Sequence, residues 1–303
     1  MADQYLGSHE AIENQQSFYN VIRSTGFEET PFFSSIGSIS FKNKDPREGH
    51  TWFYRKRPDG TGTNAHAEGG KRADVKSYAA TKLQNELQIF KKSYGVTGSQ
   101  KDVMSVEGKQ NYLSVQSEMA AVDLSLSIER ALFTNTAPVA AATDADIRKM
   151  GGIAHYLIHD IDAAGADLSW KLHIKEMLKM MWKNGCRANY IMSGPDQKDA
   201  LDDILDLKKQ YVGNETGIVS NASIIKDASY AKNVKVVANP LMGDDEILFY
   251  DSRLLNIVLH RQIKGRNCSD PNYDAEAYEH LMELTYQMDD PYAMVRIRNL
   301  KTS

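Results

Sequence analysis

Residues 110–133 read QNYLSVQSEMAAVDLSLSIERALF and carry the clearest secondary-structure signal in the chain. Apolar residues recur there at spacings of three, four and seven, and a second stripe lies beside the first at spacings of four. The first stripe consists of Tyr112, Val115, Met119, Val122, Leu126 and Phe133, and the second of Ala120, Leu124, Ile128 and Leu132. The pattern predicts a helix over 107–135, about 40 Å long at roughly 1.5 Å per residue. Its apolar face is wide enough to pack against a sheet and a neighbouring surface together.

The segment before this helix begins with what we expect to be a docking arm. Ser8–Arg23 is weakly amphipathic, but it is too short and too polar to hold a core of its own. Pro31 then breaks the helical pattern and is followed by Phe32 and Phe33. We expect these two aromatic residues to form an anchor in extended conformation that docks on another copy.

Residues 41–100 are expected to form an extended β-hairpin. The strand-forming stretches are 51–54, which contains Trp52, and 83–96. The segment between them is polar, contains Gly69-Gly70 and lacks periodicity, so its tip cannot form a core. Connections longer than about 12–15 residues are usually functional or disordered, and we therefore expect an intermolecular contact. The basic residues available to pair with acidic patches on another copy are Arg55, Lys56, Arg57, Lys71 and Arg72.

From Gly151 onward the pattern alternates between helices and strands. GGIAHYLIHDI, residues 151–161, is expected to be a strand, and an amphipathic helix is expected over 168–184 with Gly185 as its C-cap. A second helix starts near Pro195 and continues to about Tyr211. The further expected strands are 190–192, 234–237, 246–250, 254–259, 281–288 and 292–300.

Composition and charge exclude several classes of protein. The 303 residues are 42% hydrophobic and 25% charged, which is typical of a folded protein of about one to two domains. The net charge of −4 shows no basic surplus of the kind that binding to nucleic acid phosphates requires. The two cysteines, Cys186 and Cys268, are too few for a disulfide-rich secreted fold. No secretory signal pattern and no membrane-spanning run of about 18 apolar residues is found, so synthesis in the cytosol is expected.

No set of residues has the spacing of a catalytic or cofactor site. His155 and His159 could share a metal, but they lack the glutamate of a zincin motif and a third ligand. Gly60-Thr61-Gly62 has no following GK[ST] and is not a phosphate loop. Cys186 follows a helix C-terminus, where the dipole raises a thiol pKa. We predict no catalytic residue, no metal and no cofactor, although acidic groups such as Asp202-Asp203 and Asp244-Asp245-Glu246 could hold a hard cation.

Several segments, in a consistent order, resemble the major capsid proteins of tailed phages that share the Hong Kong 97 fold. VIRSTGFEETPFFSSIG (21–37) resembles the arm of that family, HTWFYRKR (50–57) and NAHAEGG (64–70) its loop elements, and LQIFKKSYGVTGSQKDV (87–103) the strand that leads into 110–133. RKMGGI (148–153), VKVVANPLMGDDEILFYDSRLLNIVLHR (234–261) and MELTYQMDDPYAMVRIRNL (282–300) are similar to its later segments.

The resemblance implies an α+β Hong Kong 97-type capsid fold. In that fold residues 1–40 are the N-terminal arm (N-arm), 41–100 the E-loop hairpin and 101–150 the P-domain spine helix. Residues 151–270 are then the A-domain and 271–303 the closing strands of the P-domain.

The same resemblance implies a function and partners. The subunit would form hexamers and pentamers of an icosahedral head, assembled in the host cytoplasm around double-stranded DNA that it does not read in sequence. Scaffolding, portal and decoration proteins are further possible partners, and no membrane is implied. Three other classes remain open on the sequence: an encapsulin-like compartment, a metal- or nucleotide-dependent enzyme, and a tail or portal component.

Overall fold

The computed structural model describes residues 30–42, 45–58, 65–71, 77–100, 112–143, 146–206, 224–228 and 230–302. The expected arm helix over Ser8–Arg23 lies outside these ranges. The helical segments are α2 (Pro31–Ser35), η3 (Pro46–Glu48), α4 (Tyr112–Thr134), α5 (Ile153–Tyr156), the π-helix η4 (Trp170–Lys175), α6 (Glu176–Lys183), α7 (Pro195–Asp206) and η5 (Ser252–Leu254). The strands are β1 (Gly37–Ser40), β2 (His50–Tyr54), β3 (Thr81–Asn85), β4 (Gln88–Thr97), β5 (His159–Asp162), β6 (Tyr190–Ser193), β7 (Ile224–Ala228), β8 (Ala231–Ala238), β9 (Ile247–Tyr250), β10 (Leu255–Asn267), β11 (Ala275–Met288) and β12 (Met294–Arg298).

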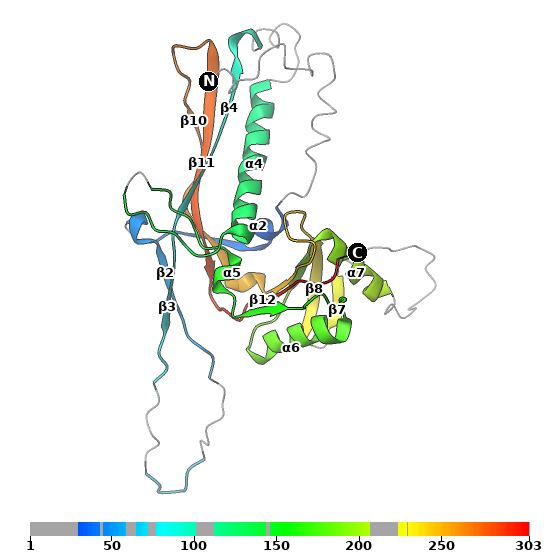
Figure 1. Ribbon diagram of the computed structural model, residues 1–303. Helices are drawn as coiled ribbons and strands as arrows, with labels where there is room; N and C mark the ends of the chain where they lie inside the picture. Colours follow the sequence, from blue (N-terminus) through cyan, green and yellow to red (C-terminus); the bar gives the residue numbers. More distant parts are fainter. Residues whose placement is uncertain are drawn as a thin grey trace.

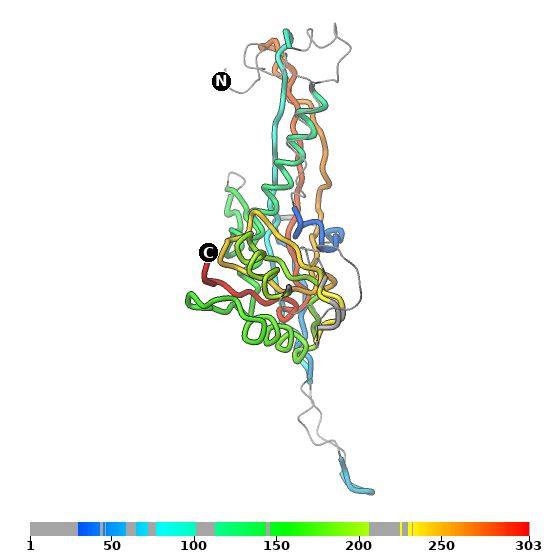
Figure 2. The backbone as a smooth tube through the Cα atoms, turned by 90° about the vertical axis from the view of Figure 1, so that its right-hand side faces the viewer, coloured from blue at the N-terminus to red at the C-terminus, as the bar shows by residue number. Residues whose placement is uncertain are grey.

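A long four-stranded sheet and helix α4 form the upper part of the molecule in Figure 1. The strand order is β1-β10-β11-β4, with β1 parallel to β10 and the other neighbours antiparallel. Strands β10 and β11 are 13 and 14 residues long and pair along almost their whole length. Helix α4 runs beside β4 and β11 in both views (Figures 1 and 2). The predicted long helix is therefore present, and it packs on a sheet as its apolar width suggested.

The second of the two apolar stripes on α4 forms the core. Ala120, Leu124, Ile128 and Leu132 are all buried, whereas Met119 on the first stripe keeps 38% of its surface exposed. The first stripe therefore lies at the edge of the helix–sheet contact and part of it faces outward. Residues spaced by four lie on the same face of a helix, because a turn has about 3.6 residues. This face of α4 packs against the sheet.

A six-stranded sheet forms the second part of the molecule, with the order β5-β12-β9-β6-β8-β7. Strand β9 lies near the middle and is buried at every position, as expected for an apolar run covered on both faces. Helix α6 contacts β12, and α7 contacts β6 and β8. The expected helix over 168–184 is present, but its first turn-and-a-half is the π-helix η4. Gly185 follows α6 with φ +92°, the left-handed C-cap conformation that the sequence predicted.

The third sheet is the two-stranded ribbon of β2 and β3, which points away from the other two (Figure 1). The expected second hairpin strand, 83–96, is divided between two sheets. Thr81–Asn85 pairs with β2, whereas Gln88–Thr97 pairs with β11 in the four-stranded sheet. Glu86 and Leu87 lie between the two strands, and both are buried.

Two local expectations are wrong. Residues 31–35 form the short helix α2 and not an extended anchor, because proline fits the first turn of a helix as well as it breaks one. Residues 153–156 form helix α5, so only residues 159–161 of the expected strand 151–161 lie in a strand, which is β5 (His159–Asp162).

Sheet membership also differs from the expected division at 270. Strand β10 lies before that boundary but belongs to the long sheet, while β12 lies after it but belongs to the six-stranded sheet. From residue 260 onward β10 is exposed and, apart from Ile263 and Gly265, polar, so only the start of the strand has an apolar pattern.

Phe32 lies where the cores of the two large sheets meet. Its ring packs edge-on against Phe133 of α4 and Tyr250 of β9, with centroid distances of 5.5 and 5.2 Å, and also contacts Tyr286 of β11. Helix α2 therefore closes a core that is shared by α4 and both sheets.

Candidate assembly surfaces

The root of the β2–β3 ribbon is fixed by buried polar contacts to the end of β11. Trp52 donates from Nε1 to the carbonyl oxygen of Met288 at 2.8 Å, and the His50 ring, stacked on Trp52, hydrogen bonds to Gln287 through Nε2. Burial lowers the pKa of His50, so this ring is neutral near pH 7. The indole of Trp52 faces its own chain and is buried, so its expected role as a contact between copies is wrong.

Asn85 holds the other strand of the ribbon. Its side chain is fully buried and makes four hydrogen bonds, two donated to the carbonyl oxygens of Gly151 and Tyr286 and two accepted from the amides of Glu86 and Gly151. A buried amide with all its groups satisfied fixes geometry, because any displacement leaves polar groups unpaired. The ribbon therefore leaves the body in a set direction.

Beyond its root the ribbon is exposed and basic. Arg55, Lys56, Arg57 and Lys71 are all exposed, and Arg72 lies outside the described residues. Phe53 points away from the core and keeps 69% of its surface exposed. The basic residues that the sequence singled out are therefore exposed, and the exposed aromatic residue beside them is Phe53, whereas Trp52 is buried.

The basic segment shares a cleft with the end of α6. Arg57 lies against Gly185, where an added Cβ would meet its Nη1 at 2.7 Å. The cleft has a volume of about 640 Å3, and Trp182 and Tyr292 provide aromatic surface in its lining. The cations that line it are Lys56, Arg57, Lys183 and Arg187. Lys183 and Arg187 lie 126 positions or more from Arg57, so no local sequence pattern joins them to the basic residues of the ribbon.

The segment around α2 is anchored within its own chain. The buried carboxylate of Glu129 accepts hydrogen bonds from the backbone amides of Phe32 and Phe33 at 2.9 and 2.7 Å. It accepts a third from Asn239 Nδ2 at 2.7 Å. Burial raises the pKa of Glu129, and the three hydrogen bonds oppose that shift. Phe32 is fully buried, so the expectation that it contacts another copy is wrong; Phe33 is only half-buried and keeps that role as a prediction.

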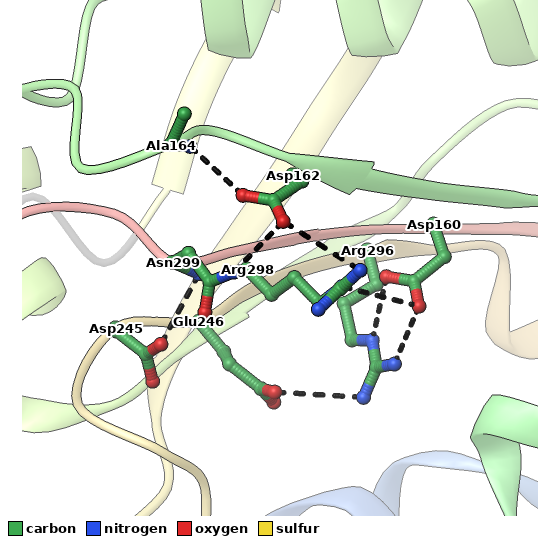
Figure 3. A network of polar contacts seen from close by, with 8 residues as sticks. All are labelled: Asp160, Asp162, Ala164, Asp245, Glu246, Arg296, Arg298 and Asn299. Carbon is green, nitrogen blue, oxygen red and sulfur yellow. Dashed lines mark hydrogen bonds and ion pairs between the residues drawn. The ribbon is translucent and has the colours of Figure 1, made fainter.

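A network of charged side chains lies over one edge of the six-stranded sheet (Figure 3). Arg296 of β12 pairs with Asp160 of β5 through two hydrogen bonds of 3.0 and 2.7 Å and contacts Glu246 at 3.5 Å. Arg298 forms an ion pair with Asp162 at 3.6 Å, and Asn299 donates a hydrogen bond from Nδ2 to the same carboxylate at 2.9 Å. These pairs face each other across the parallel β5–β12 register, and such cross-strand opposite charges stabilise a sheet.

His155 and His159 do not share a site. His155 lies on α5 and is exposed, whereas His159 lies on β5 beside Tyr292. Cys186 is buried, and burial and then the nearby Asp290 raise the pKa of its thiol to about 12, so burial rather than the helix dipole is the main cause. No group of three or more metal-ligating side chains occurs in the part of the chain that the structure describes. Within the same part, no helix has the length and hydropathy needed to cross a membrane.

A family model described as the SU10 major capsid protein matches residues 5–301. The chain belongs to this family. It is a major capsid protein, a structural component of a phage virion and not an enzyme.

Solved phage capsids have the same fold as this capsid protein. The cyanophage A-1(L) capsid is 12% identical with a TM-score of 0.64, covering 90% of this chain and 93% of that one. The capsid of a native gene transfer agent particle is 8% identical, with a TM-score of 0.64 and coverages of 91% and 92%. Gordonia phage Cozz gives 12% identity, a TM-score of 0.60 and coverages of 91% and 87%. No curated protein matches the capsid protein in sequence.

Proposed function

We propose that this capsid protein builds an icosahedral phage head from hexamers and pentamers, and that the head encloses double-stranded DNA. The observation that carries the proposal is the β2–β3 ribbon. Its root is held by the buried Trp52 and Asn85, yet the segment beyond it is exposed and contacts little of its own chain. An ordered projection of this kind is stabilised when identical copies cover it.

The elements of the Hong Kong 97 fold can be assigned in this proposal from the sheets and helices of the structure. Helix α4 is the proposed spine helix, and with β4, β10 and β11 it forms the proposed P-domain. The β2–β3 ribbon and the connection between its strands are the proposed E-loop. The six-stranded sheet with α6 and α7 is the proposed A-domain. Residues 1–40 are the proposed N-arm, whose strand β1 pairs with β10.

The exposed basic residues of the ribbon contact acidic surface on a neighbouring copy in this proposal. Arg55, Lys56, Arg57 and Lys71 are exposed, and Arg72 follows them in sequence. Half-buried Phe33 and exposed Phe53 add apolar contact. Charged groups at the rim of an interface set orientation and specificity more than affinity, which suits a subunit that must join neighbours in one way.

The proposed partners follow from the same role. The shell assembles in the host cytoplasm, and scaffolding, portal and decoration proteins act on it. Its DNA contacts are independent of sequence. The net charge of −4 suits an inner surface that does not hold the genome tightly, because DNA affinity depends on phosphate-neutralising cations.

Electron microscopy of the recombinant full chain tests the proposal. Closed particles with fivefold and sixfold clusters of subunits are the expected result. Open rings or tubes would point to another virion component. Monomers at every protein and salt concentration tried would contradict assembly by this chain alone, and repetition with the phage's scaffolding protein would then decide whether that partner is required.

A further inference from the structure

Two surfaces of opposite charge lie on different sides of the capsid protein. The first is the cleft between the ribbon root and the end of α6, which is lined by Lys56, Arg57, Lys183 and Arg187. None of these four side chains has an ion pair with another residue of the described chain. Four unpaired cations in one cleft stand out in a chain whose net charge is −4.

The second surface is a stripe of aspartates on α7. Asp196, Asp199 and Asp203 follow each other at spacings of three and four, so they lie on one face of the helix. Asp199 and Asp203 are exposed, Asp196 is half-exposed, and none of the three has a partner among the described residues. Their neighbour Asp202 differs, because it is paired with Lys198 on the same helix. The stripe spans about 10 Å at roughly 1.5 Å per residue.

The two surfaces cannot meet within one molecule. Helix α7 packs on β6 and β8 and lies on the side of the six-stranded sheet away from the β2–β3 ribbon (Figure 1). The cleft lies on the ribbon side, because Arg57 and Gly185 touch there. Complementary patches on opposite sides of a subunit generate a heterologous contact, and such a contact closes into a ring when the rotation between copies allows it.

We infer that the acidic stripe of α7 in one copy docks in the basic cleft of the next copy, and that this contact repeats around each ring of subunits. The inference rests on the proposed shell function and names the acidic partner of Lys56 and Arg57. The lining of the cleft favours a protein occupant over a bare phosphate. Trp182 keeps 47% of its surface exposed there, and aromatic side chains are enriched at interfaces between proteins.

The contact should be sensitive to charge and to salt. Ion pairs at an exposed interface weaken as ionic strength rises, because the screening length falls to about 8 Å at 0.15 M salt. Like charges brought together across an interface oppose association and exclude wrong partners. Reversing the sign of either surface should therefore block the contact, and reversing both should restore it.

A charge-swap experiment on the full chain tests the inference. The cleft variant carries Lys183→Glu and Arg187→Glu, which leaves the ribbon untouched, and the stripe variant carries Asp196→Lys, Asp199→Lys and Asp203→Lys. The control variant carries Lys171→Glu and Lys175→Glu, which change the charge equally at exposed positions outside the cleft. Shell yield is measured by sedimentation and electron microscopy, and folding of each variant by circular dichroism.

Each single-surface variant should fold and lose about tenfold or more of the shell yield, as expected for the loss of about 1.4 kcal/mol per contact. The combined variant should recover most of the yield, and the control should match the unchanged protein. If a reversal prevents folding, the neutral pair Lys183→Gln and Arg187→Gln replaces it, with a smaller loss expected.

Three results would overturn the inference. The first is normal shell yield from either single-surface variant. The second is a loss of shell yield in the cleft variant that is not recovered when the stripe substitutions are added in the combined variant. The third is normal assembly of the cleft variant together with loss of its binding to a short double-stranded DNA probe. That result would assign the cleft to nucleic acid. Failure of the unchanged protein to form shells under any condition would instead count against the proposed function itself.

Discussion

Glu129 Oε1 lies 2.9 Å from the backbone nitrogen of Phe32, and this hydrogen bond joins the middle of the chain to the start of α2. Replacing Glu129 with alanine leaves the buried amides of Phe32 and Phe33 without their acceptor. We expect the free energy of unfolding to fall by about 1–3 kcal/mol, measured by chemical denaturation. Glu129→Gln keeps one acceptor oxygen, so its free energy of unfolding should fall by less. An equal fall in both variants would show that the hydrogen-bond acceptor does not account for the stability.

The same carboxyl group predicts a dependence on pH. Burial raises the pKa of Glu129 above its ordinary value of 4.5. The folded state therefore binds this proton more tightly than the unfolded state, and its contribution to stability is lost as pH rises from 4.5 through the folded pKa. Comparing the thermal midpoints of the unchanged protein and of Glu129→Gln across that range isolates the effect, because glutamine does not titrate.

Phe32 and Phe33 should respond differently to truncation. Phe32 is fully buried between α4 and both large sheets, so Phe32→Ala should reduce the free energy of unfolding by about 3–5 kcal/mol. Phe33 is half-buried, so Phe33→Ala should reduce shell yield more than it reduces stability. Denaturation curves and sedimentation of both variants check this, and similar stability losses for the two would contradict it.

His50 should make the ribbon root sensitive to acid. Burial lowers the pKa of His50 below its ordinary value of 6.5, so protonation favours the unfolded state. Stability is therefore lost as pH falls below 6.5 and through the folded pKa. Because His159 and His173 also have lowered pKa values, the quantity to measure is the difference between the unchanged protein and His50→Gln. A steeper acid loss in the unchanged protein is the expected result.

Arg296 and Arg298 offer a matched pair at the sheet edge. The Arg296 side chain is 17% exposed and binds Asp160 with two hydrogen bonds, whereas Arg298 is 42% exposed and contacts Asp160 and Asp162 at 3.6 Å. We expect Arg296→Ala to reduce the free energy of unfolding by about 2 kcal/mol and Arg298→Ala by less than about 1 kcal/mol. Urea denaturation at low and high salt distinguishes the two, since the exposed pair is screened more strongly.

Removal of residues 58–72 should separate folding from assembly. Residues 65–71 are all exposed, and the ribbon root at Trp52 and Asn85 lies outside the deletion. We expect a folded protein whose thermal midpoint is close to that of the unchanged chain but which forms no stable shells. A deletion variant that is unfolded by circular dichroism would show that the segment belongs to the core.

Sequence patterns predicted the parts of the fold that have a local cause. The long helix, the helix over 168–184 with Gly185 after it, and the position of β9 follow from periodicity, capping and an unbroken apolar run. The full lengths of β10 and β11 could not be predicted, because their distal halves mix polar and apolar residues without a strand pattern and are held by pairing with each other and with β4. Strand identity there depends on a partner and not on the residues of one strand.

The candidate surfaces were predicted in part, for a similar reason. Arg55, Lys56 and Arg57 are adjacent in sequence and were found together, whereas Lys183 and Arg187 join them only through the fold. Phe32 and Trp52 were misassigned because an exposed aromatic residue and a buried one look the same in sequence. Only the receiving side chains Phe133, Tyr250 and Tyr286 show that Phe32 is an internal residue.

The strand pairing has a consequence for the time at which this protein can fold. Strand β1 at residues 37–40 pairs with residues 256–259, and β12 at 294–298 lies between β5 and β9. Neither large sheet can be completed until the ribosome has translated almost the whole of the described chain, so much of the folding must follow synthesis of these residues. Pairing over such sequence distances is slow and leaves strand edges open meanwhile. When many copies are synthesised at once, the newly made chains are therefore the form of the protein most prone to aggregation.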